Sequence, residues 1–254
     1  MKAQAKNKHF YSGLSGIALP VPKYKFPVAF RDTSRLAYYA SLFSSLEVNS
    51  SFYRIPAPRT VEKWALSVPG NFKFTFKLFR EVTHNKGLAF KEENIAAFFN
   101  SIDHVGDHKG CVLVQLPPGT DFSALPQLKL LLQCISAKNR SQHWKIAIEV
   151  RHKSWYCSQL YNLIDDANVA LVIHDIPKSA TPMIHQNSDV VYLRFHGPTG
   201  NYRDSYPESF LYEYAGYIRE WISENKTVYA YFNNTMGDAY NNQLVLTRFV
   251  AEYA

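Results

Sequence analysis

Cysteine is scarce in this sequence of 254 residues, which has only Cys111, Cys134 and Cys157, none of them paired in a C-x-x-C motif. The odd number and the wide spacing argue against a disulfide framework and against a zinc site. None of the three stands at a predicted strand end beside a histidine, so we do not expect thiol catalysis. Reduced thiols of this kind are typical of cytoplasmic proteins.

Long apolar runs and common nucleotide motifs are also missing. No run approaches the roughly 18 apolar residues that a membrane span needs, and residues 1–6 lack the apolar core of a signal peptide. We therefore expect a cytoplasmic protein without a membrane partner. No G-x-G-x-x-G motif or phosphate loop follows the first predicted strand, and no G-x-S-x-G elbow occurs.

The overall composition is that of a globular protein with a basic surface. Hydrophobic residues make up 46% of the chain and charged residues 19%, which argues against disorder. The formal net charge of +7 favours an anionic small molecule or nucleic acid as partner. Aromatic residues account for 15%, so we expect aromatic-lined pockets as well as an aromatic core.

Short apolar runs alternate with segments of helical periodicity along the whole chain. The runs lie at 11–17, 46–53 with its loop, 72–77, 111–116, from 145 onward, 169–175, 190–197 and 227–232. Helical segments follow a cap at 32–34 and lie near 61–68, 95–102, 123–138, 159–166, 209–223 and 239–252. Eight strands with seven or eight helices predict an α/β fold, a single (β/α)8 TIM-type barrel with parallel strands and outer helices. We assign residues 11–254 to this domain and residues 1–10 to a flexible leader. A doubly wound open sheet is the competing fold, and it is disfavoured because the phosphate loop is missing.

Nearly every predicted strand ends in a polar or ionisable side chain. The carboxyl ends of the strands in such a barrel meet at one mouth, where active sites lie, so we expect these side chains to converge. In chain order they are Glu47, Asn49, Lys77 with His84 beyond it, Gln115, Glu149, Arg151, His152, Asp175, Arg194, His196, Asn233 and Asn234.

Seven motifs in order carry a family resemblance. They are EVNSSFYRIP at 47–56, Lys77 with Thr83 and His84, QLPP at 115–118, EVRHKSW at 149–155, DIP at 175–177, RFHG at 194–197 and YFNN at 231–234. On these motifs the chain resembles the YecE-like family of bacterial and archaeal proteins, a domain of unknown function (family 72), over nearly its whole length. The resemblance implies a TIM-type barrel and the location of a pocket, and it implies no reaction.

The chain departs from the family pattern at two places. Where the family opens with a Gly-Thr-Ser-Gly-Trp strand, residues 13–17 read Gly-Leu-Ser-Gly-Ile, which puts in doubt any stacking at the first strand. Thr235 stands where the family has Asp after Phe-Asn-Asn, so one carboxylate is missing here.

The residue types at the strand ends predict acid–base chemistry on an anionic, phosphate-containing substrate, as in a hydrolase or phosphodiesterase. Glu149 is the leading general acid or base, with Glu47 or Asp175 second. Lys77, Arg151 and Arg194 would hold the anion, because guanidinium groups bind phosphate in a bidentate manner. The proposed proton carriers or orienting groups are His84, His152 and His196, and the proposed hydrogen-bonding groups are Asn49, Gln115, Asn233 and Asn234.

Other functions remain open at this stage. Paired carboxylates on neighbouring strands would also suit a carbohydrate-active enzyme. A non-catalytic nucleic-acid or nucleotide-binding protein would stack bases on aromatic side chains, for which the candidates are Tyr53, Trp155, Tyr192, Tyr231 and Phe232. A divalent metal could be held by members of the set His84, His152, His196, Glu149 and Asp175. We do not favour the metal, because three basic side chains in the same mouth would repel a cation.

Overall fold

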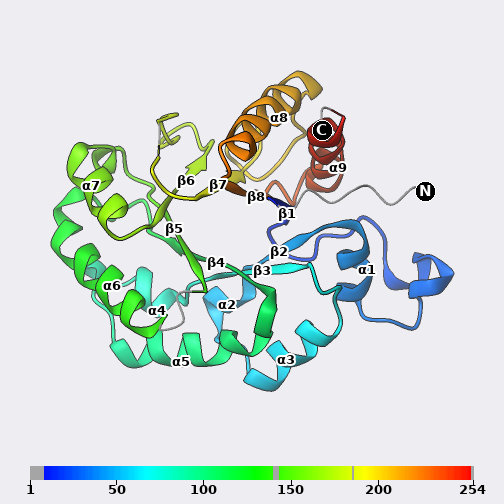
Figure 1. The fold of residues 1–254 in the computed structure, drawn as a ribbon, viewed down its shortest axis with the longest axis horizontal. Coiled ribbons are helices and arrows are strands. Elements are labelled where there is room, and N and C mark those ends of the chain that lie inside the picture. Colours follow the sequence, from blue (N-terminus) through cyan, green and yellow to red (C-terminus); the bar gives the residue numbers. More distant parts are fainter. Residues whose placement is uncertain (1–8, 140–142, 185, 253–254) are drawn as a thin grey trace.

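The computed structural model describes residues 9–139, 143–184 and 186–252, and it shows a barrel of parallel strands wrapped by helices (Figure 1). The strands are β1 (Phe10–Leu14), β2 (Ser45–Val48), β3 (Lys73–Lys77), β4 (Lys109–Gln115), β5 (Lys145–Glu149), β6 (Ala170–His174), β7 (Val190–Phe195) and β8 (Thr227–Phe232). They pair in parallel in the order β1-β8-β7-β6-β5-β4-β3-β2. This arrangement confirms the predicted TIM-type barrel.

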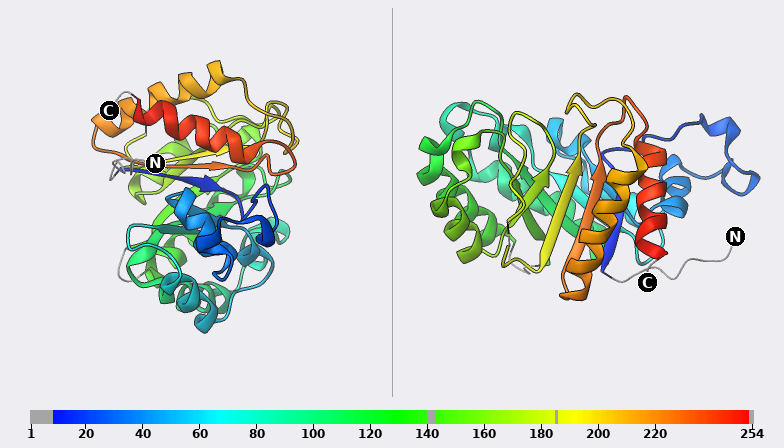
Figure 2. Two further views of the ribbon diagram at one scale, coloured as in Figure 1. Left: turned by 90° about the vertical axis from the view of Figure 1, so that its right-hand side faces the viewer. Right: turned by 90° about the horizontal axis from the view of Figure 1, so that it is seen from above.

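Helices cover the outside of the strands. They are α1 (Arg35–Leu42), α2 (Ser50–Tyr53), α3 (Pro58–Leu66), α4 (Arg80–Thr83), α5 (Glu92–Ile102), α6 (Leu125–Lys138), α7 (Ser158–Asp166), α8 (Glu208–Ser223) and α9 (Ala239–Ala251). Ser34 caps α1 as predicted, because its hydroxyl accepts a hydrogen bond from the Ala37 N–H at 3.0 Å. The last two long helices, α8 and α9, lie side by side (Figure 2).

Side chains help to close the barrel between β1 and β2, where the described residues form one isolated bridge, between Ser15 and Glu47. The Tyr39 hydroxyl inserts between the two strands, accepting from the Leu14 N–H at 2.7 Å and donating to the Ser45 carbonyl at 2.9 Å. Gly13 permits this approach, because a Cβ at that position would lie 1.9 Å from the Ser45 oxygen. The Ser44 hydroxyl, directly before β2, accepts from the Ser12 N–H of β1 at 2.9 Å, so side-chain hydroxyls bridge this seam of the barrel.

The strands divide their side chains between two apolar layers. In β4, Val112 and Val114 belong to the large core between strands and helices, whereas Cys111 and Leu113 belong to a smaller core inside the barrel. This alternation is the period of two that any strand imposes. Continued by one more step, it directs Gln115 inward at the carboxyl end of the same strand.

Some predicted boundaries differ from the structure. The segment 81–84 lies outside the predicted helical segments, yet most of it belongs to the single turn α4, and the predicted helix near 159–166 begins at Ser158, directly after Cys157. Within the ranges that the structure describes, β6 and β7 are joined without an α-helix, so the barrel has an irregular connection there. The predicted leader lies outside the described residues over 1–8, and β1 already begins at Phe10.

Candidate functional site

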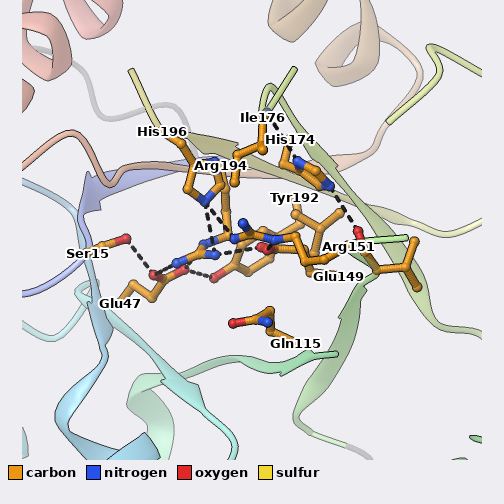
Figure 3. A network of polar contacts seen from close by, with 12 residues as sticks. Ser15, Glu47, Gln115, Glu149, Arg151, His174, Ile176, Tyr192, Arg194 and His196 are labelled. Carbon is orange, nitrogen blue, oxygen red and sulfur yellow. Dashed lines mark hydrogen bonds and ion pairs between the residues drawn. The ribbon is translucent and has the colours of Figure 1, made fainter. Parts of the chain in front are cut away.

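A polar layer occupies the inside of the barrel at the carboxyl ends of the strands (Figure 3). It follows from strand periodicity, because these residues stand two positions beyond an inward-facing position of the same strand or its end. Tyr192 of β7, for example, belongs to the inner apolar core, and Arg194 follows it on the same face. The members of the layer that Figure 3 shows are Ser15, Glu47, Gln115, Glu149, His174 and Arg194. Lys77, at the end of β3, belongs to the same layer because its charge interacts with Arg194, Glu149 and Glu47.

Arg194 joins two carboxylates that come from β2 and β5. Its Nε and Nη2 donate to the two oxygens of Glu47 at 3.0 and 2.8 Å, and its Nη1 donates to Oε2 of Glu149 at 2.6 Å. Glu47 also accepts from the hydroxyls of Ser15 at 2.5 Å and Tyr192 at 2.6 Å. Glu47, Glu149 and Arg194 are at most 1% exposed, so the ion pairs are enclosed by protein.

Both glutamates are held in their charged form. Burial by itself raises the pKa of Glu47, but the charge and hydrogen bonds of Arg194 outweigh burial and lower it. The pKa of Glu149 lies well below its ordinary value, because Arg151 and Arg194 together outweigh the effect of burial. At neutral pH these carboxylates have no proton to donate. In this arrangement they anchor guanidinium groups.

A second set of contacts orients Arg151 and His196, and it is joined to the Glu47–Arg194–Glu149 network through Glu149. Arg151 forms an ion pair with Glu149 through Nε, and its Nη2 lies 3.0 Å from Nε2 of His196. On the other side of the ring, Nδ1 of His196 lies 3.2 Å from Asp175 Oδ1, which also accepts from the His196 backbone N–H at 2.8 Å. The second oxygen of Asp175 accepts from the Tyr206 hydroxyl.

The surroundings keep His196 neutral. Burial lowers its pKa to about 4, although the hydrogen bond with Asp175 opposes this change. With the ring neutral, the neighbouring carboxylate assigns the ring proton to Nδ1, and Nε2 is left to accept from Arg151. Asp175 and His196 therefore position the guanidinium of Arg151.

Lys77 and His84 lie on the β3 side of the mouth, against one aromatic ring. The Lys77 ammonium nitrogen is 4.2 Å from the ring centroid of Phe52, and the rings of His84 and Phe52 are 4.7 Å apart. Burial and the nearby Arg194 lower the pKa of Lys77 to about 8. Burial and the charge of Lys77 lower the pKa of His84 to about 4, so that His84 is neutral at pH 7.

Three predicted amides also lie at the mouth. Gln115 faces the Glu149–Arg194 network in Figure 3, although its Nε2 donates to the Leu116 carbonyl at 2.8 Å. Asn233 is half-buried just beyond β8. The side-chain oxygen of Asn49 is buried, and it has no hydrogen-bond partner among the described residues. Asn49 therefore offers a hydrogen-bond acceptor directly after the carboxyl end of β2.

Three predicted aromatic residues are part of the core. Trp155 and Tyr231 are fully buried, with the indole N–H donating to the Thr120 carbonyl at 2.7 Å and the phenol 2.6 Å from the Ser45 hydroxyl. Phe232 is likewise fully buried. Rings enclosed in this way leave no face for a base or sugar, so the structure gives them a packing role in place of the predicted stacking role.

Three other predicted residues lie apart from the network. Asn234 is buried in the following loop, where its amide nitrogen donates to Asn242 Oδ1 at 3.0 Å and holds that loop. His152 is exposed, and its Nδ1 lies 2.7 Å from the Ser154 hydroxyl. Tyr53 is 69% exposed on α2, which leaves its ring free to meet a partner.

Sequence reasoning missed or misread four polar contributors. Ser15 and Tyr192 both donate to Glu47, although Tyr192 had been considered only for stacking. Tyr206 contacts Asp175 from a loop that carries no recognisable signal. His174 was omitted in favour of its neighbour Asp175, yet its Nε2 lies 3.0 Å from the Val150 carbonyl inside the barrel. Counting inward positions by twos along β6 and β7 would have found His174 and Tyr192.

The acidic and imidazole side chains at the mouth do not gather around a common point. In the part of the chain that the structure describes, no three His, Cys, Asp or Glu side chains are grouped so that they could hold a metal ion. Glu149 faces guanidinium groups, Asp175 faces Tyr206 and His196, and His152 lies outside. Nor do the described residues include a helix that is long and apolar enough to span a membrane.

Comparison with known proteins places the chain in a family. The family model described as "Protein of unknown function DUF72" matches residues 13–253, and the chain therefore belongs to this family. UPF0759 protein YunF of Bacillus subtilis is 28% identical, over 85% of this chain and 86% of its own length. UPF0759 protein YecE of Escherichia coli is 24% identical, over 55% of this chain and 50% of its own length. The YecE-like resemblance seen in the seven motifs is thereby confirmed.

Solved structures of the family have the same fold. A DUF72 family protein from Enterococcus faecalis aligns with a TM-score of 0.76 at 23% identity, covering 95% of each chain. A DUF72 family protein from Thermotoga maritima aligns with a TM-score of 0.71 at 24% identity, covering 95% of this chain and 98% of the other. At identities of 23% and 24% these alignments show that the folds are alike, and they do not assign a reaction to this chain.

Proposed function

We propose that the protein is an enzyme that binds an anionic, phosphate-containing substrate at the mouth of the barrel and hydrolyses its phosphate ester. The supporting observation is the distribution of charge between accessible and enclosed groups. Glu47 and Glu149 are fully buried and paired with guanidinium groups, whereas the side chains of Lys77, of Arg151 (9% exposed) and of Asp175 (16% exposed) are partly accessible. Asp175 already accepts hydrogen bonds from Tyr206 and from the His196 backbone, so the groups left to contact an anion are Lys77 and Arg151.

In this proposal Arg151 is the main anion-binding group. Its contacts to described residues use Nε toward Glu149 and Nη2 toward His196, which hold the planar fork in one orientation. The remaining N–H groups of that fork are suited to two oxygens of one phosphate. Because the fork is held before the ligand arrives, binding costs little side-chain entropy.

His84 and Asn49 supply the other contacts that hydrolysis requires. Nδ1 of His84 lies 2.8 Å from the Thr83 hydroxyl, so Nε2 is the nitrogen left to orient an attacking water. The neutral ring can accept a hydrogen bond from that water at pH 7. The unpaired oxygen of Asn49 would accept from a hydroxyl or amino group of the substrate.

The carbohydrate alternative receives no support from this geometry. A glycosidase needs one protonated carboxyl group to protonate the leaving oxygen, and that group has a raised pKa. Glu47 and Glu149 are shifted in the opposite direction and are bound to the same guanidinium. We therefore do not take the two glutamates as an acid and a nucleophile.

Thermal unfolding in the presence of candidate ligands tests the proposal. Inorganic phosphate, nucleotides, phosphate monoesters and phosphodiesters would be compared with neutral sugars, and each stabilising ester would then be assayed for phosphate release. A ligand at 100 times its dissociation constant stabilises by about 2.7 kcal/mol, a shift of several degrees.

Two variants make the result specific. Arg151→Ala is expected to abolish the shift produced by phosphate compounds. Lys145→Ala, which removes an exposed charge from the other end of β5, is expected to keep it. Stabilisation by neutral sugars alone, or an anion effect that survives Arg151→Ala, would contradict the proposal. If phosphate esters stabilise the protein but no phosphate is released, the protein binds these esters and the proposed hydrolysis is contradicted.

A further inference from the structure

Lys77 differs from the two arginines of the site in its counter-charge. Arg194 forms ion pairs with Glu47 and Glu149, and Arg151 forms an ion pair with Glu149. None of the ion pairs formed by the described residues includes Lys77. Its ammonium nitrogen lies instead over the face of Phe52, at 4.2 Å from the centroid. The ring face and the more distant Glu47 and Glu149 stabilise the ammonium charge, but burial and the neighbouring guanidinium groups outweigh them and make the proton easier to release.

The charges around Lys77 act in both directions, and together with burial they lower its pKa. Burial and Arg194 lower its pKa, Glu149 and Glu47 raise it, and Arg151 lowers it further, to about 8. At pH 7 roughly a tenth of the molecules then carry a neutral amine, about 200 times the fraction for an ordinary lysine of pKa about 10.4. A neutral amine is the nucleophilic form.

We propose that Lys77 is a nucleophile that forms an imine with an aldehyde or ketone whose anionic group is held by Arg151. This inference rests on the anion site proposed above and adds a covalent step and a carbonyl-bearing class of substrate.

In the first step the Lys77 nitrogen attacks the carbonyl carbon, and the carbonyl oxygen takes up a proton to give a carbinolamine. Loss of the hydroxyl group as water then forms the C=N bond, so that amine and carbonyl compound yield imine and one water without oxidation or reduction. His84 is placed to move the proton, because its neutral ring packs on the same Phe52 that Lys77 covers.

Lys73 provides a matched control within the same strand. It stands at the opposite end of β3, four positions earlier, and its ammonium group donates to the Asp107 carbonyl at 2.7 Å. Its pKa is also lowered, chiefly by burial. Lys73 therefore shares the strand and a lowered pKa with Lys77, and it lies away from the proposed anion site, with its ammonium group held by Asp107.

The experiment traps the imine by reduction. The full chain would be incubated with glyceraldehyde 3-phosphate or with uncharged glyceraldehyde, reduced with cyanoborohydride, and mapped by mass spectrometry. We expect one saturable adduct per chain at Lys77, formed at a concentration of the phosphorylated aldehyde at least tenfold lower than that of glyceraldehyde. Inorganic phosphate is expected to compete with it.

Variants separate the covalent step from anion binding. Lys77→Arg, which keeps the positive charge, and Lys77→Met should both lose the adduct and keep a cooperative thermal transition, whereas Lys73→Arg should retain it. Adducts spread over many lysines and unchanged in Lys77→Arg would overturn the imine. If both aldehydes label Lys77 equally and Arg151→Ala has no effect, the imine stands and the anion site fails. If phosphate stabilises the protein through Arg151 and no adduct forms, the anion site stands and the imine fails.

Discussion

Replacing Glu47 with glutamine is the sharpest test of the charged network, because it removes one charge and leaves the shape nearly unchanged. Each carboxylate oxygen of Glu47 accepts two hydrogen bonds, from Arg194 and Ser15 on one oxygen and from Arg194 and Tyr192 on the other. The amide nitrogen of glutamine would face one guanidinium N–H and one hydroxyl, of which only the hydroxyl can accept, so at least one hydrogen bond to Arg194 is lost. Arg194 then keeps Glu149 as its counter-charge. Removing one partner of a buried ion pair costs about 3–5 kcal/mol, and we expect Glu47→Gln to destabilise by this amount.

Urea unfolding at pH 7 measures the effect, with tryptophan fluorescence as the signal because Trp144 and Trp155 are buried. Glu62→Gln, an exposed substitution on α3, is the control and should change stability by less than about 0.5 kcal/mol. Tyr192→Phe removes one donor to the same carboxylate and should cost about 1.5–3 kcal/mol. Because both substitutions act on one hydrogen bond, the double variant should lose less than the sum. A loss below about 1 kcal/mol for Glu47→Gln would refute the network described here.

Two further predictions concern the barrel closure and the acid side of the stability curve. Tyr39→Phe removes the hydroxyl between Leu14 and Ser45 and leaves two buried backbone groups unpaired, so the free energy of unfolding in urea should fall by about 2–4 kcal/mol. A decrease below about 1 kcal/mol would show that the two strands do not need this hydroxyl. The pKa of His196 is about 4 in the folded protein and about 6.5 in the unfolded chain, so the unfolded chain takes up this proton at the higher pH. The free energy of unfolding should therefore fall by roughly 3 kcal/mol for this group as the pH drops from about 6.5 to about 4. His196→Gln should flatten that part of the curve, whereas the exposed His104→Gln should leave it unchanged; an unaltered slope in His196→Gln would contradict the assignment.

Much of the barrel and the location of its site could be predicted from local patterns. Apolar runs such as 111–116 are long enough for one buried strand, and their regular alternation with helical segments admits few arrangements of a chain this long. Glu149 and Arg194 stand at the ends of such runs, and parallel strands bring those ends to one mouth. The irregular link between β6 and β7 and the turn α4 depend on local packing, which apolar periodicity does not report.

Strand periodicity alone predicts which side chains face the inside of the barrel at its carboxyl end, because the period of a strand is two residues and needs no partner. It does not assign charges to partners, since Glu47 and Arg194 are 147 positions apart in the chain. The folded structure was needed to show that both glutamates pair with guanidinium groups and that Trp155 and Tyr231 are core. It was also needed to show that Lys77 forms no ion pair with a carboxylate of the described residues. Pairing and burial depend on distances across the barrel, and those distances exist only once all eight strands have closed.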